Sequence, residues 1–296
     1  QKIHGKDNVI ASDVYSSSTF DGVFEIIDAT DIKAIENIVN KYAVNQIYHL
    51  AAILSAKGEK NPLRTWDLNM KMMLNVFEAA RINNVKKVFF PSSIAVFGDK
   101  APLENTPQSA FLNPATVYGM SKVAGENWAQ YYFNKYGLDI RSIRYPGIIG
   151  YQSMPGGGTT DYAVEIYHSA VKQEKYSCFL NPETKLPMIF MDDAIRSTIE
   201  LMQAPKKNIK TRTSYNLGSM SFSPNEITEE IQKLYPNFKV EYNADFRQEI
   251  ADKWPKSIND DEARKDWNWK PKYDLKLMTL VMLEKLEKKY NTTTLK

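Results

Sequence analysis

A tyrosine and a lysine stand four residues apart in the stretch VYGMSK, as Tyr118 and Lys122. Residues i and i+4 lie on the same face of an α-helix, so a helix here would project the phenol and the ammonium together. Such a pair can move a proton, with the phenol as the base and the ammonium favouring its ionised form. The spacing also occurs by chance on many helices, so the motif alone leaves an active site and an ordinary helix surface both open.

Two serines, Ser92 and Ser93, end the apolar run KKVFFPSS (86–93), twenty-five residues before Tyr118. We expect this run to be a buried β-strand. A hydroxyl at the end of such a strand can hydrogen-bond a reacting oxygen. An arbitrary serine at this place is more often a turn or cap residue, so the type alone does not assign a role.

Strand-like and helix-like segments alternate through the first half of the chain. We expect strands over 8–13, 23–31, 46–52, 86–93 and 139–150, and helices over 31–44, 68–84 and 117–136, with Asp31 as an N-cap. This order predicts a parallel sheet with helices on both faces. Ligands bind such sheets at the carboxyl ends of the strands, which is where the polar residues follow.

The pattern changes after residue 150. A glycine-rich loop runs into a helix over 155–164, and shorter elements follow, with helices near 223–235, 246–254 and 274–290. We therefore expect a sheet domain over 1–150 and a smaller lobe over 151–296 that packs across the strand ends.

Composition excludes several classes of protein. Of the 296 residues, 43% are hydrophobic and 25% are charged, which is typical of a globular protein. The formal net charge is only +3 and the sequence has no long run of Lys and Arg, so we expect no nucleic-acid partner. No run of about 18 apolar residues exists, so we expect no membrane span. Cys178 is the only cysteine, and His4, His49 and His168 are far apart, so we expect no metal site. We expect a cytoplasmic location, with an upstream targeting segment left open because the first residue is Gln1.

Motifs spread along the chain resemble a known family. They are HLAA (49–52), PSSIAVFG (91–98), VYGMSK (117–122), RYPGIIG (144–150) and DDEARKDWNWKP (260–271). Over essentially its full length the chain resembles the extended short-chain dehydrogenase/reductases. Within them it is most similar to the L-threonine 3-dehydrogenases of short-chain type, on PGGGTTDYAVEIYHSAV, LPMIFMDDAIR and KWPKSINDDEARKDW. The resemblance implies a Rossmann-like, doubly wound parallel sheet with NAD bound by 1–150 and a smaller substrate lobe in 151–296.

The resemblance also implies catalytic roles. Tyr118 would be the general base, and Lys122 would lower its pKa and hold a ribose hydroxyl of the cofactor. Ser93 would hydrogen-bond the substrate oxygen, with Ser92 as the alternative because a double serine leaves the register open by one. No metal is implied.

The implied cofactor is NAD. Asp13 stands where the family's ribose-binding acid stands, and no Arg follows in DVYSSS, which favours NAD over NADP. Other positions resemble cofactor contacts or their support, with a helix cap as the alternative for Asn69: they are Asp28, Ala29, Leu50, Ala51, Ala52, Asn69, Pro146 and Ile148.

One feature departs from the family. None of the 13 glycines forms the G-x-G-x-x-G or G-x-x-G-x-x-G turn that holds a pyrophosphate. The first recognisable strand, NVIASD, resembles the family's second. We therefore expect a segment of roughly 20–25 residues upstream, the size of a strand, a turn and most of a helix. Without it the parallel sheet would have a gap in its middle and an unpaired edge.

The implied reaction is oxidation of the 3-hydroxyl of L-threonine to 2-amino-3-oxobutyrate. The residues expected to bind this substrate are Ser55, Ser93, Tyr118, Thr159, Thr160 and Trp254. Thr159 and Thr160 would stand at a helix start, where free N–H groups suit a carboxylate, and Trp254 would wall the pocket. A helix cap and a core aromatic are the ordinary alternatives. A nucleotide-sugar epimerase or dehydratase and a non-catalytic NAD-binding regulator are the other functions considered.

The helices over 68–84 and 117–136 carry apolar residues beyond one narrow stripe. These include Met72, Trp128, Tyr131 and Tyr132. Burial within the subunit must account for some of them. In the resembling family the corresponding helices pair across a two-fold axis, so we expect a homodimer by that route.

Overall fold

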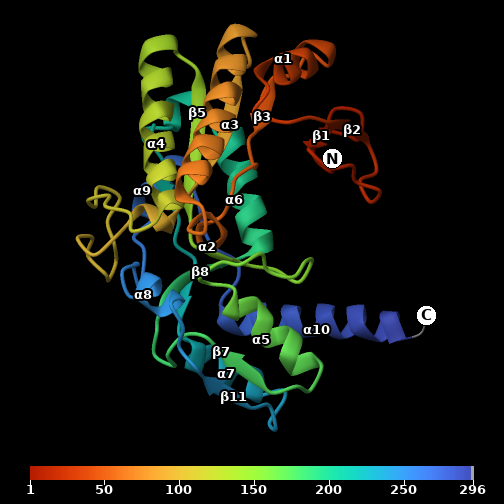
Figure 1. Cartoon of the computed structure of the whole chain (residues 1–296), viewed down its shortest axis with the longest axis vertical. Helices are drawn as coiled ribbons and strands as arrows, with labels where there is room; N and C mark the ends of the chain where they lie inside the picture. Colours follow the sequence, from red (N-terminus) through yellow and green to blue (C-terminus); the bar gives the residue numbers. More distant parts are fainter. Residues whose placement is uncertain (295–296) are drawn as a thin grey trace.

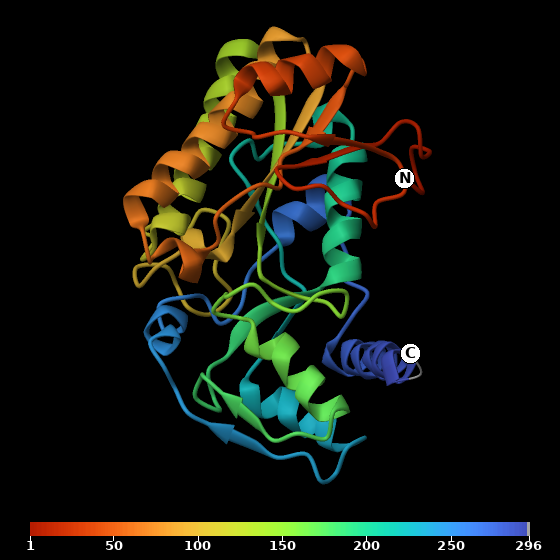
Figure 2. The same cartoon turned by 45° about the vertical axis from the view of Figure 1, so that its right-hand side comes forward.

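The computed structural model describes residues 1–294 and has two bodies joined along one side (Figure 1). The sheet body holds a central parallel sheet between layers of helices, and Figure 2 shows these layers on opposite faces of the strands. The small lobe holds short strands and the helix that ends the described chain. No helix within residues 1–294 combines the length and apolarity needed to cross a lipid bilayer.

The central sheet has four parallel strands in the order β3-β4-β5-β9. They are β3 (Gln46–Tyr48), β4 (Lys87–Ser93), β5 (Asp139–Tyr145) and β9 (Tyr215–Asn216). Four of the seven residues of β4 and six of the seven of β5 are buried, as expected for inner strands covered on both faces. Their register places Ser93 of β4 beside Tyr145 of β5 at the carboxyl ends.

The parallel sheet is interrupted. β1 (Ile10–Asp13) and β2 (Val23–Ile26) pair with each other, in parallel, and with no other strand of the described chain. β3 likewise pairs only with β4, so β1 and β3 each keep one unpaired edge. The gap that the sequence predicted in this sheet is therefore present, and it separates the β1–β2 pair from β3.

Helices cover both faces of the central sheet, which confirms the doubly wound α/β class. α1 (Ile32–Lys41), α3 (Pro62–Ile82) and α4 (Val117–Tyr136) pack on one face; α6 (Met191–Gln203) and α9 (Asp261–Trp267) pack on the other. Each layer has its own core cluster around the strands, so the sheet is sealed from water on both sides.

Helix starts follow local capping chemistry. The Asp31 side chain accepts from the amides of Lys33 and Ala34, which confirms it as the N-cap of α1. α3 begins six residues before the expected 68–84 helix, because Asn61 caps it and Pro62 occupies its first position. α4 has the expected bounds, and its C-cap is Gly137, whose φ of 71° suits glycine.

The expected strand over 139–150 is two strands. Pro146 lacks the amide needed to continue the ladder, so β5 ends at Tyr145 and β6 (Gly147–Ile149) pairs with β8 (Leu186–Phe190) in a different sheet. β10 (Met220–Phe222) completes this sheet on the other edge of β8. The chain thus leaves the sheet body for the small lobe at Pro146.

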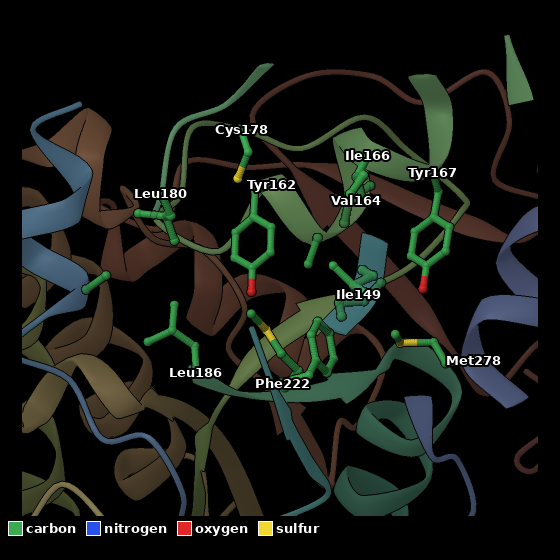
Figure 3. Close-up of a cluster of buried hydrophobic side chains, with 14 of the residues drawn as sticks. Ile149, Tyr162, Val164, Ile166, Tyr167, Cys178, Leu180, Leu186, Phe222 and Met278 are labelled. Atoms are coloured by element: carbon green, nitrogen blue, oxygen red, sulfur yellow. The ribbon is translucent and has the colours of Figure 1, made fainter. Parts of the chain in front are cut away.

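The small lobe is built around one apolar cluster that reaches back to residues 94–97. Figure 3 shows side chains from β6, β8, β10, α5 (Tyr162–Val171) and β7 (Tyr176–Cys178) converging there. β7 pairs with β11 (Val240–Tyr242), and the lobe also holds α7 (Pro224–Gln232), α8 (Arg247–Ala251) and α10 (Leu275–Thr294).

The expected division at residue 150 stays a prediction, and the topology qualifies it. β9 pairs with β5 in the central sheet, and α6 and α9 cover one face of it. The second half of the chain therefore supplies part of the sheet body as well as the small lobe.

A buried ion pair ties these elements together. Arg144 of β5 donates to both carboxylate oxygens of Glu126 of α4, at 2.9 and 2.7 Å, and both side chains are almost fully buried. The third guanidinium nitrogen of Arg144, Nη1, donates to Gln108 O and to Asn216 Oδ1 of β9. Ser92 Oγ of β4 donates to Glu126 at 2.6 Å. One group of polar side chains thus connects β4, β5, β9 and α4.

We predict that Glu126→Ala destabilises the fold by about 3–5 kcal/mol, because it leaves the Arg144 guanidinium buried without its charge partner. Urea denaturation followed by circular dichroism measures this loss. Glu200→Ala is the control, since Glu200 pairs with Arg196 on the surface of α6 at 34% side-chain exposure. It should cost about 0.3–0.5 kcal/mol. Equal losses for the two variants would contradict the role given to the buried pair.

Candidate active site

The candidate site lies at the carboxyl end of β4, where the first turn of α4 meets the η1 turn (Ile94–Val96). Close approach requires a glycine in α4: a Cβ on Gly119 would stand 2.1 Å from Ala95 O. The helix start is fixed by Thr116, whose hydroxyl accepts from Gly119 N, and by Glu59, whose carboxylate accepts from Val117 N at 2.8 Å. Tyr118 is therefore held by the backbone on both sides of it.

Tyr118 and Lys122 lie together on one face of α4, as the spacing predicted. The Lys122 ammonium is 5.2 Å from the centre of the Tyr118 ring and 4.7 Å from that of Phe90. It donates to Pro91 O at 2.7 Å, and only 5% of the residue is exposed. Lys122 is thus bonded to the backbone near the carboxyl end of β4, in a largely apolar setting.

Burial, and not the charge of Lys122, dominates the pKa of Tyr118 in this structure, and its lowering by Lys122 together with a bound nicotinamide stays a prediction. Burial raises the pKa of Tyr118 to about 12, and a hydrogen bond from the Ser93 side chain offsets part of that rise. Burial also lowers the pKa of Lys122 to about 7. Both shifts have the same physical cause, because desolvation penalises the charged form of either group more than their mutual attraction favours it. His49 is affected in the same way: burial, and then the Lys122 charge, lower its pKa to about 3.

The two serines have different surroundings. Ser92 is buried and donates to Glu126, so its hydroxyl is committed to the Arg144 network. Ser93 is only partly buried, its hydroxyl accepts from Ala95 N at 3.2 Å, and it acts on the pKa of Tyr118. The geometry therefore favours Ser93 over Ser92 as the serine that faces the candidate site.

The acids expected to bind cofactor lie at strand ends with exposed carboxylates. Asp13 ends β1 and accepts from Tyr15 N at 3.2 Å. Asp28 follows β2, and a hydrogen bond from Thr30 N lowers its pKa. Ala29 O is bonded by Asn75 of α3, which fixes this turn. The other expected contacts, Leu50, Ala51 and Ala52, follow β3, while Pro146 and Ile148 flank the crossing from β5 to β6.

Asn69 is not a helix cap, and its side-chain amide is bonded to the backbone. It lies within α3, 7% exposed, and its side chain bonds both backbone groups of Ile53: Oδ1 accepts from Ile53 N at 2.8 Å and Nδ2 donates to Ile53 O at 3.1 Å. Asn69 thereby holds the segment after β3 against α3. These bonds agree with the expected support of the strand ends, and direct contact of Asn69 with a cofactor stays a prediction.

The helix-start donors expected for a carboxylate are mostly occupied. α5 begins at Tyr162, two residues beyond Thr160, and its first-turn amides at 163–165 bond to backbone oxygens of residues 160 and 161. The Asp161 carboxylate accepts from Gly157 N and Gly158 N at 2.7 and 2.6 Å. An acidic side chain thus takes the place in which a ligand carboxylate was expected.

The remaining substrate-side residues offer unpaired polar atoms. Thr159 is 1% exposed and its hydroxyl has no partner in the described structure. Thr160 packs against Gly147, where a Cβ would stand 2.8 Å from the threonine Cβ. Ser55, 7% exposed, begins the short helix α2 (Ser55–Gly58). Trp254 follows α8, is 5% exposed and belongs to the small-lobe core, and its indole N–H is also unpaired within residues 1–294.

Sequence reasoning missed Glu59, Glu126 and Arg144. All three are charged residues whose role in fixing the site no local spacing indicates, because their partners are backbone groups or residues distant in sequence. Arg144 in a strand expected at the buried centre of the sheet was a usable signal, since a buried guanidinium requires a carboxylate. Among the described residues, no group of three or more His, Cys, Asp or Glu is placed to hold a metal ion.

Comparisons with known proteins agree on the family. A model described as the NAD dependent epimerase/dehydratase family matches residues 4–218. An uncharacterised epimerase/dehydratase of Staphylococcus aureus is 48% identical over 294 residues, covering 98% of this chain and 91% of that protein. Two solved structures are similar over nearly their whole length. A GalE-like L-threonine dehydrogenase from Cupriavidus necator, in its holo form, is 48% identical (TM-score 0.95, covering 96% and 93%). A monomeric L-threonine 3-dehydrogenase from a metagenome is 51% identical (TM-score 0.94, covering 97% and 93%).

The pKa of Lys122 predicts a pH dependence of stability. Because its pKa in the folded chain, about 7, lies below the ordinary 10.5, the unfolded chain binds more protons between these values and stability rises with pH there. We predict that the wild type gains on the order of 1 kcal/mol per pH unit between pH 7 and 9 relative to Lys122→Met. Urea denaturation at pH 7, 8 and 9 measures both proteins. Parallel dependences would mean that the bond to Pro91 O keeps the ammonium charged.

Proposed function

We propose that this chain, which belongs to the NAD-dependent epimerase/dehydratase family, oxidises the 3-hydroxyl of L-threonine to 2-amino-3-oxobutyrate with NAD. The observation that carries the proposal is the grouping of Tyr118, Lys122 and Ser93 at the carboxyl end of β4, in a chain about half identical to two L-threonine dehydrogenases over nearly all its length. A tyrosine, a lysine and a serine so placed can exchange a proton with an alcohol while holding its oxygen.

Residues at both ends of the proposed cofactor site fit NAD. Asp13 presents an exposed carboxylate at the end of β1, which suits ribose hydroxyls and repels a 2′-phosphate. Pro146 and Ile148, the residues proposed for the other end of the cofactor, stand on either side of Gly147, whose lack of a Cβ lets β6 pack closely against Thr160 and Met188. No glycine turn for the pyrophosphate occurs in this sequence. When bound, NAD supplies the acceptor for the hydride that leaves the alcohol carbon.

In this proposal Tyr118 Oη takes the proton of the substrate hydroxyl. Burial opposes the phenolate, so the hydrogen bond from Ser93 and any nearby positive charge must offset that cost. Lys122 is the protein's own source of such charge, 5.2 Å from the ring, and its pKa of about 7 lets it hold or release a proton near neutral pH. Its bond to Pro91 O keeps the ammonium directed at the end of β4, next to both serines.

A small zwitterionic substrate requires polar partners within a pocket closed to water. The buried hydroxyl of Thr159 and the buried indole N–H of Trp254 lack protein partners within residues 1–294. Buried polar groups are rarely left unpaired, so these two are candidates for bonds to a ligand. We include Ser55 and Thr160 in the proposed substrate site. Asp161 is a further candidate for the ammonium, although its carboxylate is now turned to Gly157 and Gly158.

A nucleotide-sugar epimerase or dehydratase is the second candidate, because the family model and the Staphylococcus aureus relative are described as epimerase/dehydratase. Such enzymes use the same tyrosine, lysine and serine chemistry on a much larger substrate. NADH formation with L-threonine separates the two candidates from each other. Binding of NAD without turnover of any small alcohol would instead favour a regulator.

We predict that Tyr118→Phe retains NAD binding and loses about 10²–10⁴-fold in kcat with L-threonine, because it removes the proton acceptor but keeps the ring. NADH absorbance measures turnover. Tyr131→Phe is the matched control, since Tyr131 lies on the same helix at 43% exposure, and its kcat should be unchanged. Ser93→Ala should lower kcat at native stability, whereas Ser92→Ala should lower stability through Glu126. A Tyr118→Phe enzyme with near-native kcat would refute the assignment.

We also propose a homodimer through α3 and α4. Their outer face exposes Leu63, Trp66, Met120, Trp128 and Tyr131 at 36–79%, which suits an interface; Met72 is half-buried there, and Tyr132, at 6%, belongs to the subunit core instead. A relative 51% identical is described as monomeric, so the state must be measured.

We predict a dimer mass by light scattering at micromolar concentration and a shift toward monomer for Trp128→Arg, because a buried charge at the interface is unfavourable. Phe246→Arg, 62% exposed in the small lobe, is the control and should leave the mass unchanged. A wild-type monomer would end this part of the proposal.

A further inference from the structure

A basic groove lies at the far end of α4 from the candidate active site. It has a volume of about 570 Å³ and is lined by Phe133, Lys206, Lys207, Ile209, Lys210 and Arg212, which we call the basic groove. Phe133 is fifteen residues beyond Tyr118 on the same helix. At about 1.5 Å per residue this separates the groove from Tyr118 by about 22 Å. The groove is therefore outside the site described above.

The floor of the groove is apolar and its rim is cationic. Ile209 is 3% exposed, and the Phe133 ring carries Arg212 at 3.8 Å and Lys206 at 5.3 Å from its centre. The three lysines are exposed, and they stand on the short η2 turn (Lys206–Asn208) and the segment after it. An aromatic floor beneath several cations is suited to a ligand that has both a flat ring and negative charge.

The positive charge of the rim is largely uncompensated. Arg212 pairs with the buried Asp139, but no lysine of the groove has a carboxylate partner in the described part of the chain. Lys206 Nζ donates to Gly137 O, the end of α4, and Lys210 Nζ donates to Lys207 O. Contact with a helix C-terminus is a common role for a lysine and explains the position of Lys206. Lys207 and Lys210 have no such role, so their two charges face solvent.

Asp266, a second acid beside the groove, does not pair with the lysine side chains of the rim. Asp266 accepts from Tyr215 OH at 2.6 Å and from the Lys210 amide at 3.3 Å, so it is directed to the backbone and to the core tyrosine. The groove thus keeps a local excess of positive charge in a chain whose formal net charge is only +3. Concentrated charge of one sign beside an apolar wall raises the local concentration of an oppositely charged ligand.

We propose that the basic groove binds a small phosphorylated ligand with a flat ring, in the class of the nucleoside di- and triphosphates. The ring would stack on the Arg212 guanidinium, which lies over the Phe133 ring, and Lys207 and Lys210 would hold the phosphates. Three lysines on one short segment are too few and too confined for a duplex, whose backbone charges extend in a row. This proposal does not depend on the proposed activity.

Isothermal titration of the full chain with ATP, ADP and inorganic pyrophosphate tests it, with and without excess NAD. We expect ATP and ADP to bind, and Lys207→Glu/Lys210→Glu to weaken them by about tenfold or more. The control is Lys239→Glu/Lys276→Glu, which makes the same charge change at exposed sites elsewhere and should alter binding by less than about twofold. Phe133→Leu should weaken ATP but not pyrophosphate, because it removes only the ring that supports the stacked Arg212 guanidinium. Turnover of L-threonine should be unchanged in all these variants.

Three outcomes would overturn the proposal. They are no binding of ATP or ADP to the wild type, equal weakening by the two double variants, and complete loss of nucleotide binding when NAD is in excess. The last outcome would assign the binding to the proposed NAD site. Each of these can occur whether or not the chain oxidises L-threonine, so failure here leaves the proposed activity to its own test.

Discussion

The buried pair of Arg144 and Glu126 is the interaction on which the rest of the site depends. Arg144 stands on β5 and Glu126 on α4, two turns beyond Tyr118, and their two parallel bonds fix the helix against the sheet. Removing both charges from water is costly, so the pair is stable only with its further bonds to Ser92, Gln108 and Asn216. Those bonds come from three other segments, and they make the position of α4 a property of the whole sheet body.

α4 packs closely against its neighbours in this site because it has glycines at the contact points, as well as because of the Arg144–Glu126 pair. Gly119 lets α4 meet the η1 turn, and Gly125, whose Cβ would stand 2.4 Å from the Phe90 ring, lets the next turn meet β4. The same tight packing that places Tyr118 beside Ser93 also desolvates it. Burial therefore raises the pKa of Tyr118 and lowers the pKa of Lys122, so the uncharged form of each side chain is favoured. Precise placement and easy ionisation are opposed here, and bound charge is what can reconcile them.

The chain crosses between the two bodies several times, so neither body is a continuous stretch of sequence. Pro146 ends β5 and sends the chain to the small lobe, while β9 returns it to the edge of the central sheet. The candidate site lies where these crossings occur, next to the cluster that links residues 94–97 with the small lobe. Polar groups from both bodies can then face one substrate, as the unpaired Thr159 and Trp254 do from the small-lobe side.

The sequence by itself determined the α/β class, the bounds of α4, the cap at Asp31 and the gap in the parallel sheet, because these follow from periodicity, capping and the order of strands along the chain. It also placed Tyr118 and Lys122 on one helix face, since that depends only on their spacing. Tertiary structure alone decided that Ser93 rather than Ser92 faces Tyr118, that Asn69 supports a loop, and that Asp161 occupies the amides of Gly157 and Gly158. It also decided the sign of the Tyr118 pKa shift. These depend on which distant side chains share a buried volume, and no local pattern records the desolvation that such sharing produces.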